Sequence, residues 1–140
     1  VSSKFVYDRN QIMAILNQES SLMEIVKLIG SDVLPDDQKL TLEIARVIRL
    51  GFLQQNAFHQ EDTSVPMEKQ FLMMETILYL YEKCRALVNR GMPVSVLKED
   101  NIFERIIAIK YEVPNKELER FDEYHKDIDR FYDNVLERNG

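Results

Sequence analysis

The stretch PMEKQFLMMETILYLYEKCRALVNRG, residues 66–91, decides the fold class of this chain. Proline is favoured at the first position of a helix and glycine just beyond its end, so Pro66 and Gly91 mark the boundaries. Between them, apolar side chains recur at helical spacing in a stripe broad enough to be buried between neighbouring helices. The stripe consists of Met67, Phe71, Met74, Leu78 and Tyr81, with Ile77, Leu80, Cys84 and Leu87 beside it. The segment therefore predicts a long central helix from about Pro66 to Arg90.

The segment before residue 35 has the pattern of two shorter helices. The first is expected over residues 8–17, with Ile12, Ile15 and Leu16 inward, after an unpatterned start. Residues 21–24 then have the form of a capping box, in which side chains satisfy the backbone donors of a helix start, and Gly30 is placed to end the helix. The expected buried face of this second helix is Leu22, Ile25, Val26 and Ile29.

The remaining sequence extends the helical pattern. Pro35 opens a helix that ends or loosens at Gly51, Asn101 caps a short helix to about Lys110, and Pro114 precedes a final one. Residues 56–65 have no period of either kind, and no segment alternates as a strand would. We therefore expect an all-α bundle of about five to six helices with one long irregular loop, forming a single domain over residues 1–140.

The composition excludes several classes of protein. Eighteen basic and 24 acidic residues give a net charge of −6, without the clustered basic excess that nucleic-acid binding requires. Cys84 is the only cysteine, so the chain has no internal disulfide and no zinc site built from cysteines. No uncharged run approaches the roughly 18 residues of a membrane-spanning helix.

Few residues have the spacing of a chemical site. A phosphate-binding GxxxxGK[ST] loop is absent, as are GxSxG and HExxH. Asp122, His125 and Asp129 share one helix face and are the best metal candidates, but without a second carboxylate-x-x-His copy a solvated face with a half-buried histidine is favoured. Cys84 is expected to be a buried thiol. The methionines Met67, Met73 and Met74 fit either a pliable binding surface or, as favoured here, the core.

Two short stretches are more informative. FLQQNAF at residues 52–58 places two aromatic rings around three amide side chains, the combination that stacks on a purine and bonds its edge. Residues 32–37, DVLPDD, form an acidic turn between two predicted helices.

Together these segments resemble the C-terminal helical domain of the catalytic A subunit of archaeal A-type and vacuolar-type rotary ATPases. The resemblance is carried by LMEIVKLIG at 22–30, LTLEIAR at 40–46, FLQQNAF at 52–58, and DT at 62–63 followed by EKQ at 68–70. It is specific over residues 20–86, whereas residues 1–20 are a poorly recognised lead-in and residues 91–140 match in helical pattern only. The chain departs from the family pattern at Leu50-Gly51, where two acidic residues are usual, and at Ser64-Val65, where Tyr-Cys is usual.

The resemblance implies roles for both informative stretches. Phe58, with Ala57 beside it, is expected to form part of an adenine pocket, with Gln55 and Asn56 in support. The turn from Asp32 to Asp37 is expected to face the central rotor. In it, Val33 and Leu34 supply apolar contact, Asp32, Asp36 and Asp37 supply attraction to basic residues, and Pro35 supplies stiffness.

The resemblance also implies a setting for the chain. ATP or ADP with magnesium would be bound by the parent subunit, whose separate nucleotide-binding domain supplies the catalytic groups, and none is expected on this fragment alone. The expected partners are that domain, neighbouring B subunits and the central-stalk rotor, in a cytoplasmic head peripheral to a membrane across which protons or sodium ions move. The alternative is a free-standing helical adaptor whose methionine-rich face grips a partner helix.

Overall fold

The computed structural model describes residues 3–53 and 66–139, and these residues form helices and turns without a strand. The predicted all-α bundle is therefore confirmed. Its long helices are α1 (Ser3–Ile29), α2 (Asp36–Ile48), α4 (Met67–Asn89) and α8 (Phe121–Asn139). The shorter elements are the π-helix η1 (Arg49–Leu53), α5 (Val94–Leu97), η2 (Lys98–Asp100), α6 (Ile102–Ile107), α7 (Ile109–Glu112) and η3 (Leu118–Arg120).

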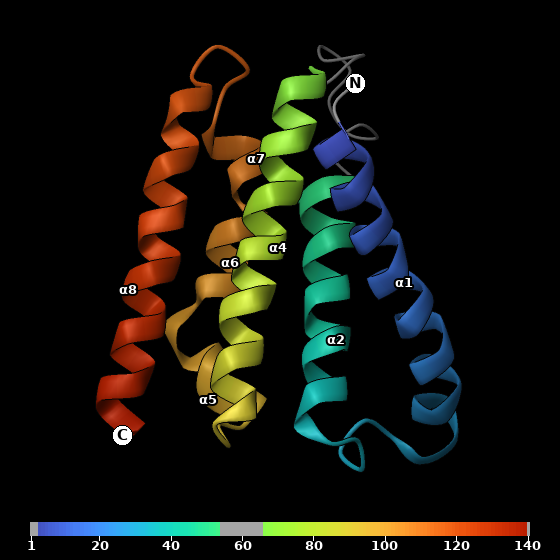
Figure 1. The fold of residues 1–140 in the computed structure, drawn as a ribbon. Helices are drawn as coiled ribbons and strands as arrows, with labels where there is room; N and C mark the ends of the chain where they lie inside the picture. Colours follow the sequence, from blue (N-terminus) through green and yellow to red (C-terminus); the bar gives the residue numbers. More distant parts are fainter. Residues whose placement is uncertain (1–2, 54–65, 140) are drawn as a thin grey trace.

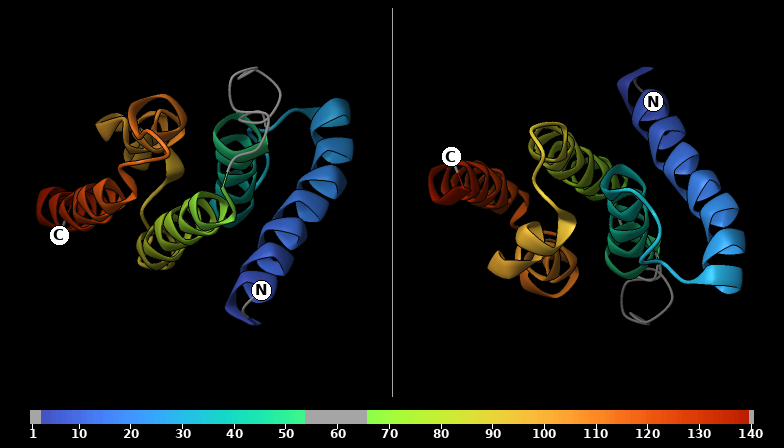
Figure 2. Two further views of the ribbon diagram at one scale, coloured as in Figure 1. Left: turned by 90° about the horizontal axis from the view of Figure 1, so that it is seen from above. Right: turned by 90° about the horizontal axis from the view of Figure 1, so that it is seen from below.

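The helix α4 occupies the centre of the bundle. It contacts α1 and α2 on one side and α8 on the other, while α6 packs against α2 and α8. Figure 1 shows α1 and α8 at opposite edges with α4 and α2 between them, and the end-on views of Figure 2 show α1 on the outside of the α2–α4 pair. One hydrophobic core joins buried residues from Ile12 in α1 to Val135 in α8.

The boundaries of α4 agree with the prediction from its sequence. Pro66 stands at the N-cap, and at the other end Gly91 adopts a positive φ of 97°. The Met92 N–H then donates to the Leu87 carbonyl at 3.1 Å, which satisfies an otherwise free acceptor of the last turn. The favoured core interpretation holds for Met73, Met74 and Cys84, which are buried, whereas Met67 is 55% exposed.

The prediction of two helices before residue 30 was wrong, because α1 is continuous from Ser3 to Ile29. The polar residues 17–21 lower helix propensity only slightly, and no glycine or proline interrupts the segment, so the hydrogen-bond ladder continues through it. The supposed capping box at 21–24 therefore lies inside the helix. Its predicted buried face was also wrong, since Leu22 and Val26 are half-buried while Ile25 and Ile29 are exposed.

Smaller differences occur at other helix ends. The final helix begins at Phe121 rather than Pro114, after a 3-10 turn, and the predicted helix to Lys110 is broken at Ala108. Asn101 precedes α6 in a left-handed conformation without a side-chain capping bond. The predicted loosening at Gly51 takes the form of the π-helix η1. A Cβ at Gly51 would lie 3.3 Å from Ile107 Cα and 3.2 Å from Met73 Cε, so this glycine permits the close approach of η1 to α6.

Candidate functional site

The turn between α1 and α2 lies at one end of the bundle (Figure 1). Gly30 leaves α1 with a positive φ of 86°, a conformation that glycine adopts without steric cost. The Leu34 N–H then donates to the Ser31 carbonyl at 3.1 Å, which closes the turn. Pro35 forms the N-cap of α2 with fixed φ, so the chain enters the helix in a defined direction.

The six predicted rotor-contact residues have different environments in this turn. Asp32, Val33, Pro35 and Asp37 are exposed, and Val33 is 58% exposed. Leu34 is buried inside the domain, so the apolar contact predicted for it is not available on this surface.

The remaining residue of the six, Asp36, is hydrogen-bonded to another part of the bundle. It is half-buried, and its Oδ1 accepts a hydrogen bond of 3.0 Å from the Val94 N–H at the start of α5. Asp36 and Asp37 also occupy the first turn of α2, where carboxylates favourably meet the positive end of the helix dipole. Both residues therefore stabilise the start of α2, whatever else they contact.

An exposed apolar surface continues from this turn along the last two turns of α1. Leu28 is 84% exposed, Ile29 63%, Val33 58% and Ile25 41%, and we call these four residues the tip patch. Two of them, Ile25 and Ile29, were predicted to face inward. The signal that could have identified the patch is the density of the run at 22–29, whose six apolar residues cover more of a helix than one face can bury.

The part of α1 that carries the tip patch packs loosely. Its buried residues are Asp8, Ile12 and Ile15, all in the first half of the helix. The second half lies between two grooves, one of about 430 Å³ toward α2 and α4 and one of about 510 Å³ toward α2 and α5. An ion pair between Glu19 and Arg49 ties this half to η1.

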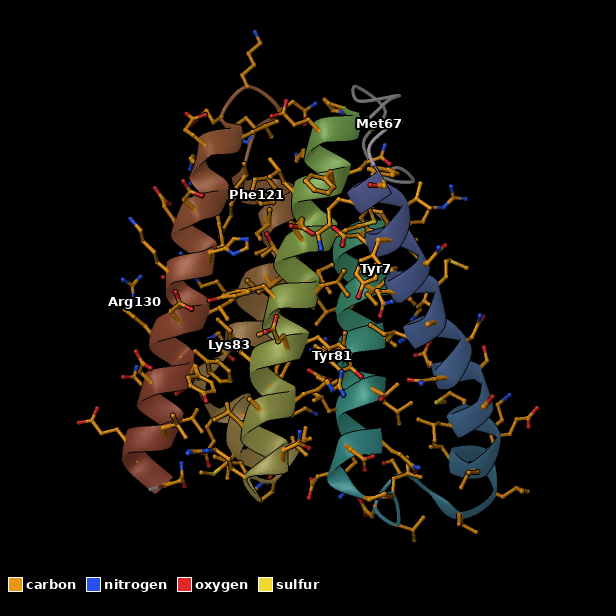
Figure 3. The ribbon with its side chains drawn as sticks, in the orientation of Figure 1. Tyr7, Met67, Tyr81, Lys83, Phe121 and Arg130 are labelled. Carbon is orange, nitrogen blue, oxygen red and sulfur yellow. The ribbon has the colours of Figure 1, made fainter. Side chains whose placement is uncertain are left out.

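The adenine-pocket prediction falls on Gln55, Asn56, Ala57 and Phe58, which lie outside the described residues. The described flanks are Leu53, the last residue of η1, and Met67, the first of α4; both side chains are about half exposed. Met67 lies at the end of the bundle opposite the α1–α2 turn (Figure 3). The helix α4, which begins at Met67 and has 23 residues, is about 35 Å long.

The comparison with known families agrees with these features. The family model for the C-terminal domain of V and A type ATP synthase matches residues 1–96. The chain belongs to this family. The resemblance noted in the sequence is thereby confirmed.

Individual members of the ATP synthase family match almost the whole chain. V-type ATP synthase alpha chain 2 of Clostridium tetani is 42% identical over 138 residues, which are 99% of this chain and 23% of that protein. The V-type ATP synthase alpha chain of Halothermothrix orenii is 42% identical over 98% of this chain and 23% of its own length. The A subunit of the A-type ATP synthase of Methanopyrus kandleri is 43% identical over 92% and 22%. The chain thus spans about a quarter of the length of the curated relatives it matches.

The metal alternative receives no support in this ATP synthase domain. Within residues 3–53 and 66–139, no three His, Cys, Asp or Glu side chains gather closely enough to hold a metal ion. Asp129 instead accepts a hydrogen bond from the Tyr79 hydroxyl, which raises the pKa of Tyr79 to about 12. His125 is half-buried against Thr76, with 3.1 Å between Nε2 and Oγ1.

A second polar cluster lies between α1 and α4. Lys4 Nζ is 3.2 Å from Asp8 Oδ1 and 3.5 Å from Glu75 Oε2. The cluster lines a groove of about 350 Å³ between the two helices, which also contains Tyr7 and Tyr81 (Figure 3). Its charges hold the first half of α1 against α4.

None of the described helices combines the length and the apolar character needed to cross a bilayer.

Proposed function

We propose that this domain is a lever in the head of a V/A-type rotary ATP synthase. One end completes an adenine pocket, and the other pushes on the central rotor. The observation that carries the proposal is that Met67, which follows the segment with the predicted adenine contacts, lies at the end of the bundle opposite the α1–α2 turn. The helix α4, which begins at Met67 and runs between these two ends, is about 35 Å long. A small movement at the nucleotide end would therefore be carried as a rigid-body motion to the turn.

The nucleotide end contributes binding rather than chemistry. Phe58 stacks on the adenine ring, with Ala57 beside it and Gln55 and Asn56 in support. ATP or ADP with magnesium is held by the rest of the parent subunit, which also supplies the catalytic groups. Hinge motion on nucleotide binding then couples ATP synthesis or hydrolysis to proton or sodium transport.

The assembly follows from the same proposal. Residues 1–140 form one domain of a longer A subunit that contacts its own nucleotide-binding domain, neighbouring B subunits and the central-stalk rotor. The head is cytoplasmic and peripheral to the membrane. The adaptor alternative is not favoured, because Met73 and Met74 of its supposed gripping face are buried in the core.

The rotor contact is tested in the assembled enzyme. A photo-crosslinking amino acid replaces Asp32, which is exposed at the turn, and a second complex carries the same probe at Tyr111 in α7 as a control. We expect a crosslink to the rotor from position 32 and none from position 111. Crosslinks from 32 only to other components of the head would reject the lever.

The adenine contact is tested by Phe58→Ala in the same enzyme. Loss of one aromatic stack should weaken ATP affinity by roughly tenfold while the rate of the phosphate step at saturation changes little. Phe58→Tyr keeps the ring and is the matched control. Unchanged affinity in Phe58→Ala would remove this residue from the pocket.

A further inference from the structure

We infer that the tip patch, rather than the acidic residues of the turn, is the surface that bears against the rotor. This inference rests on the proposed function and assigns the contact to Leu28, Ile29 and Val33, with Ile25 at the edge. The occupant is a helix of the rotor shaft with an apolar stripe flanked by basic side chains.

Burial separates the candidate contact residues into two groups. Leu34 is buried and Asp36 binds the Val94 N–H, so neither presents its full side chain to a partner. Leu28, by contrast, is the most exposed of the large apolar side chains in the described chain. The contact surface is therefore displaced from the middle of the turn toward the end of α1.

The helix geometry gives the patch the shape of a docking strip. Ile25, Leu28 and Ile29 are spaced by three and four residues, so they share one face of α1, and Val33 follows in the turn. Burying aliphatic side chains of this size contributes more to association than exposed ion pairs do. The tip patch therefore provides most of the binding contact through which the domain pushes on the rotor.

The charges around the patch indicate the chemistry of the partner. Residues 24–37 carry four carboxylates, Glu24, Asp32, Asp36 and Asp37, and one lysine, Lys27. A partner stripe flanked by basic residues complements this excess, and such complementarity mainly speeds and orients association. The acidic residues accordingly steer the rotor, and the tip patch holds it.

The loose packing of the second half of α1 suits this role. That half has no fully buried side chain and lies between two grooves, so it can adjust to the shaft as the shaft turns. The first half stays fixed to α4 through the buried Ile12 and Ile15.

The test compares two variants of the full-length protein in the assembled head, and the measurement is binding to the purified rotor. Leu28→Ser with Ile29→Ser should raise the dissociation constant at least about tenfold at both low and high salt. Asp32→Asn with Asp37→Asn should mainly slow association, and its effect should fade at high salt. Met13→Ser is the matched control, an exposed apolar residue in the middle of the same helix, and should change neither.

The outcomes distinguish failure of the tip-patch contact from failure of the proposed lever function. A large loss in the aspartate variant with none in the Leu28–Ile29 variant would overturn the tip patch and leave the lever intact. No loss in either variant, together with no crosslink from position 32, would overturn the lever itself. Self-association of the protein that only the Leu28–Ile29 variant abolishes would assign the patch to a second copy and also overturn the inference. Since these side chains are exposed, unfolding temperatures of the variants should match the parent protein and exclude misfolding.

Discussion

At the scale of single residues, the half-buried charged groups are balanced by specific neighbours. Burial of Glu75, followed by its contact with the Asp8 carboxyl, raises the pKa of Glu75 above its ordinary value, and Lys4 opposes this effect. Asp8 itself is fully buried. Lys4 is thus shared between the carboxyl groups of Asp8 and Glu75.

We therefore expect Glu75→Gln to raise the thermal unfolding temperature at pH 7. Because the pKa of Glu75 is raised on folding, the folded chain binds the proton more tightly, and stability is lost as pH rises through that pKa. Glu75→Gln removes this pH-dependent loss of stability. The difference in unfolding temperature between the variant and the parent should therefore shrink as the pH is lowered to about 4. Glu82→Gln, at an exposed position about two turns further along α4, is the control and should show no such pH-dependent gain. Equal unfolding temperatures of Glu75→Gln and the parent at pH 7 would contradict the prediction.

His125 is expected to make the domain less stable in mild acid. Thr76 donates its one hydroxyl hydrogen to the Leu72 carbonyl at 2.8 Å, so His125 Nε2 donates to the Thr76 oxygen. Burial lowers the pKa of His125, although Asp122 and Asp129 act in the opposite direction. The unfolded chain therefore takes up the proton first, and stability falls as pH drops below about 6.5.

The measurement is urea unfolding of the domain between pH 7.5 and pH 5. His125→Gln keeps a donor near Thr76 but does not titrate, so it should lose less stability over this range than the parent protein. If the free energy of unfolding changed with pH equally in His125→Gln and the parent, His125 would bind its proton equally well in the folded and unfolded chains, and the prediction would be contradicted.

At the scale of helices, the sequence predicted which segments are helical better than it predicted where each helix begins and ends. The pattern of residues 66–91 was decisive because its ends carry proline and glycine. Of its predicted apolar stripe, Met74, Ile77, Leu80, Cys84 and Leu87 are buried, whereas Phe71, Leu78 and Tyr81 are half-buried and Met67 is exposed. The start of α1 and its continuity were missed, because a polar interval such as residues 17–21 looks like a linker unless tertiary packing is known. The same ambiguity applied to Leu34 and Leu28, since a turn leucine and a helix leucine differ in burial only through the neighbours that the fold supplies.

Ser21→Ala distinguishes a continuous α1 from two helices. At a helix start the serine would cap a backbone donor, and its loss would cost about 1 kcal/mol. At an exposed interior position alanine is the better helix former, so we expect a gain of a few tenths of a kcal/mol. Chemical unfolding of the parent and variant measures the sign, and a clear destabilisation would restore the two-helix prediction.

At the scale of the whole molecule, stability is uneven along an otherwise continuous core. Buried residues from α1 to α8 form one cluster, yet none of them belongs to residues 16–29. The candidate site could be located in the sequence as a turn, but its apolar extension depends on this uneven packing, which no local pattern contains. The predicted adenine contacts at Gln55–Phe58 fall outside the described residues and stay a prediction from resemblance.

Hydrogen exchange should reveal this gradient. We expect backbone amides of residues 18–29 to exchange faster than those in the middle of α4, because local opening of the second half of α1 exposes no fully buried side chain. The first half of α1 serves as the internal control and should be protected by Ile12 and Ile15. Uniform protection along α1 would contradict the gradient.

The narrow contact at Gly51 has a consequence for protein engineering. Replacing helix glycines with alanine usually stabilises a protein, because alanine has the higher helix propensity. Here the added methyl group would press on the backbone of Ile107 as well as on the movable end of Met73. A redesign guided by propensity scales would therefore weaken the seam between η1 and α6, where the smallest residue is the best fit.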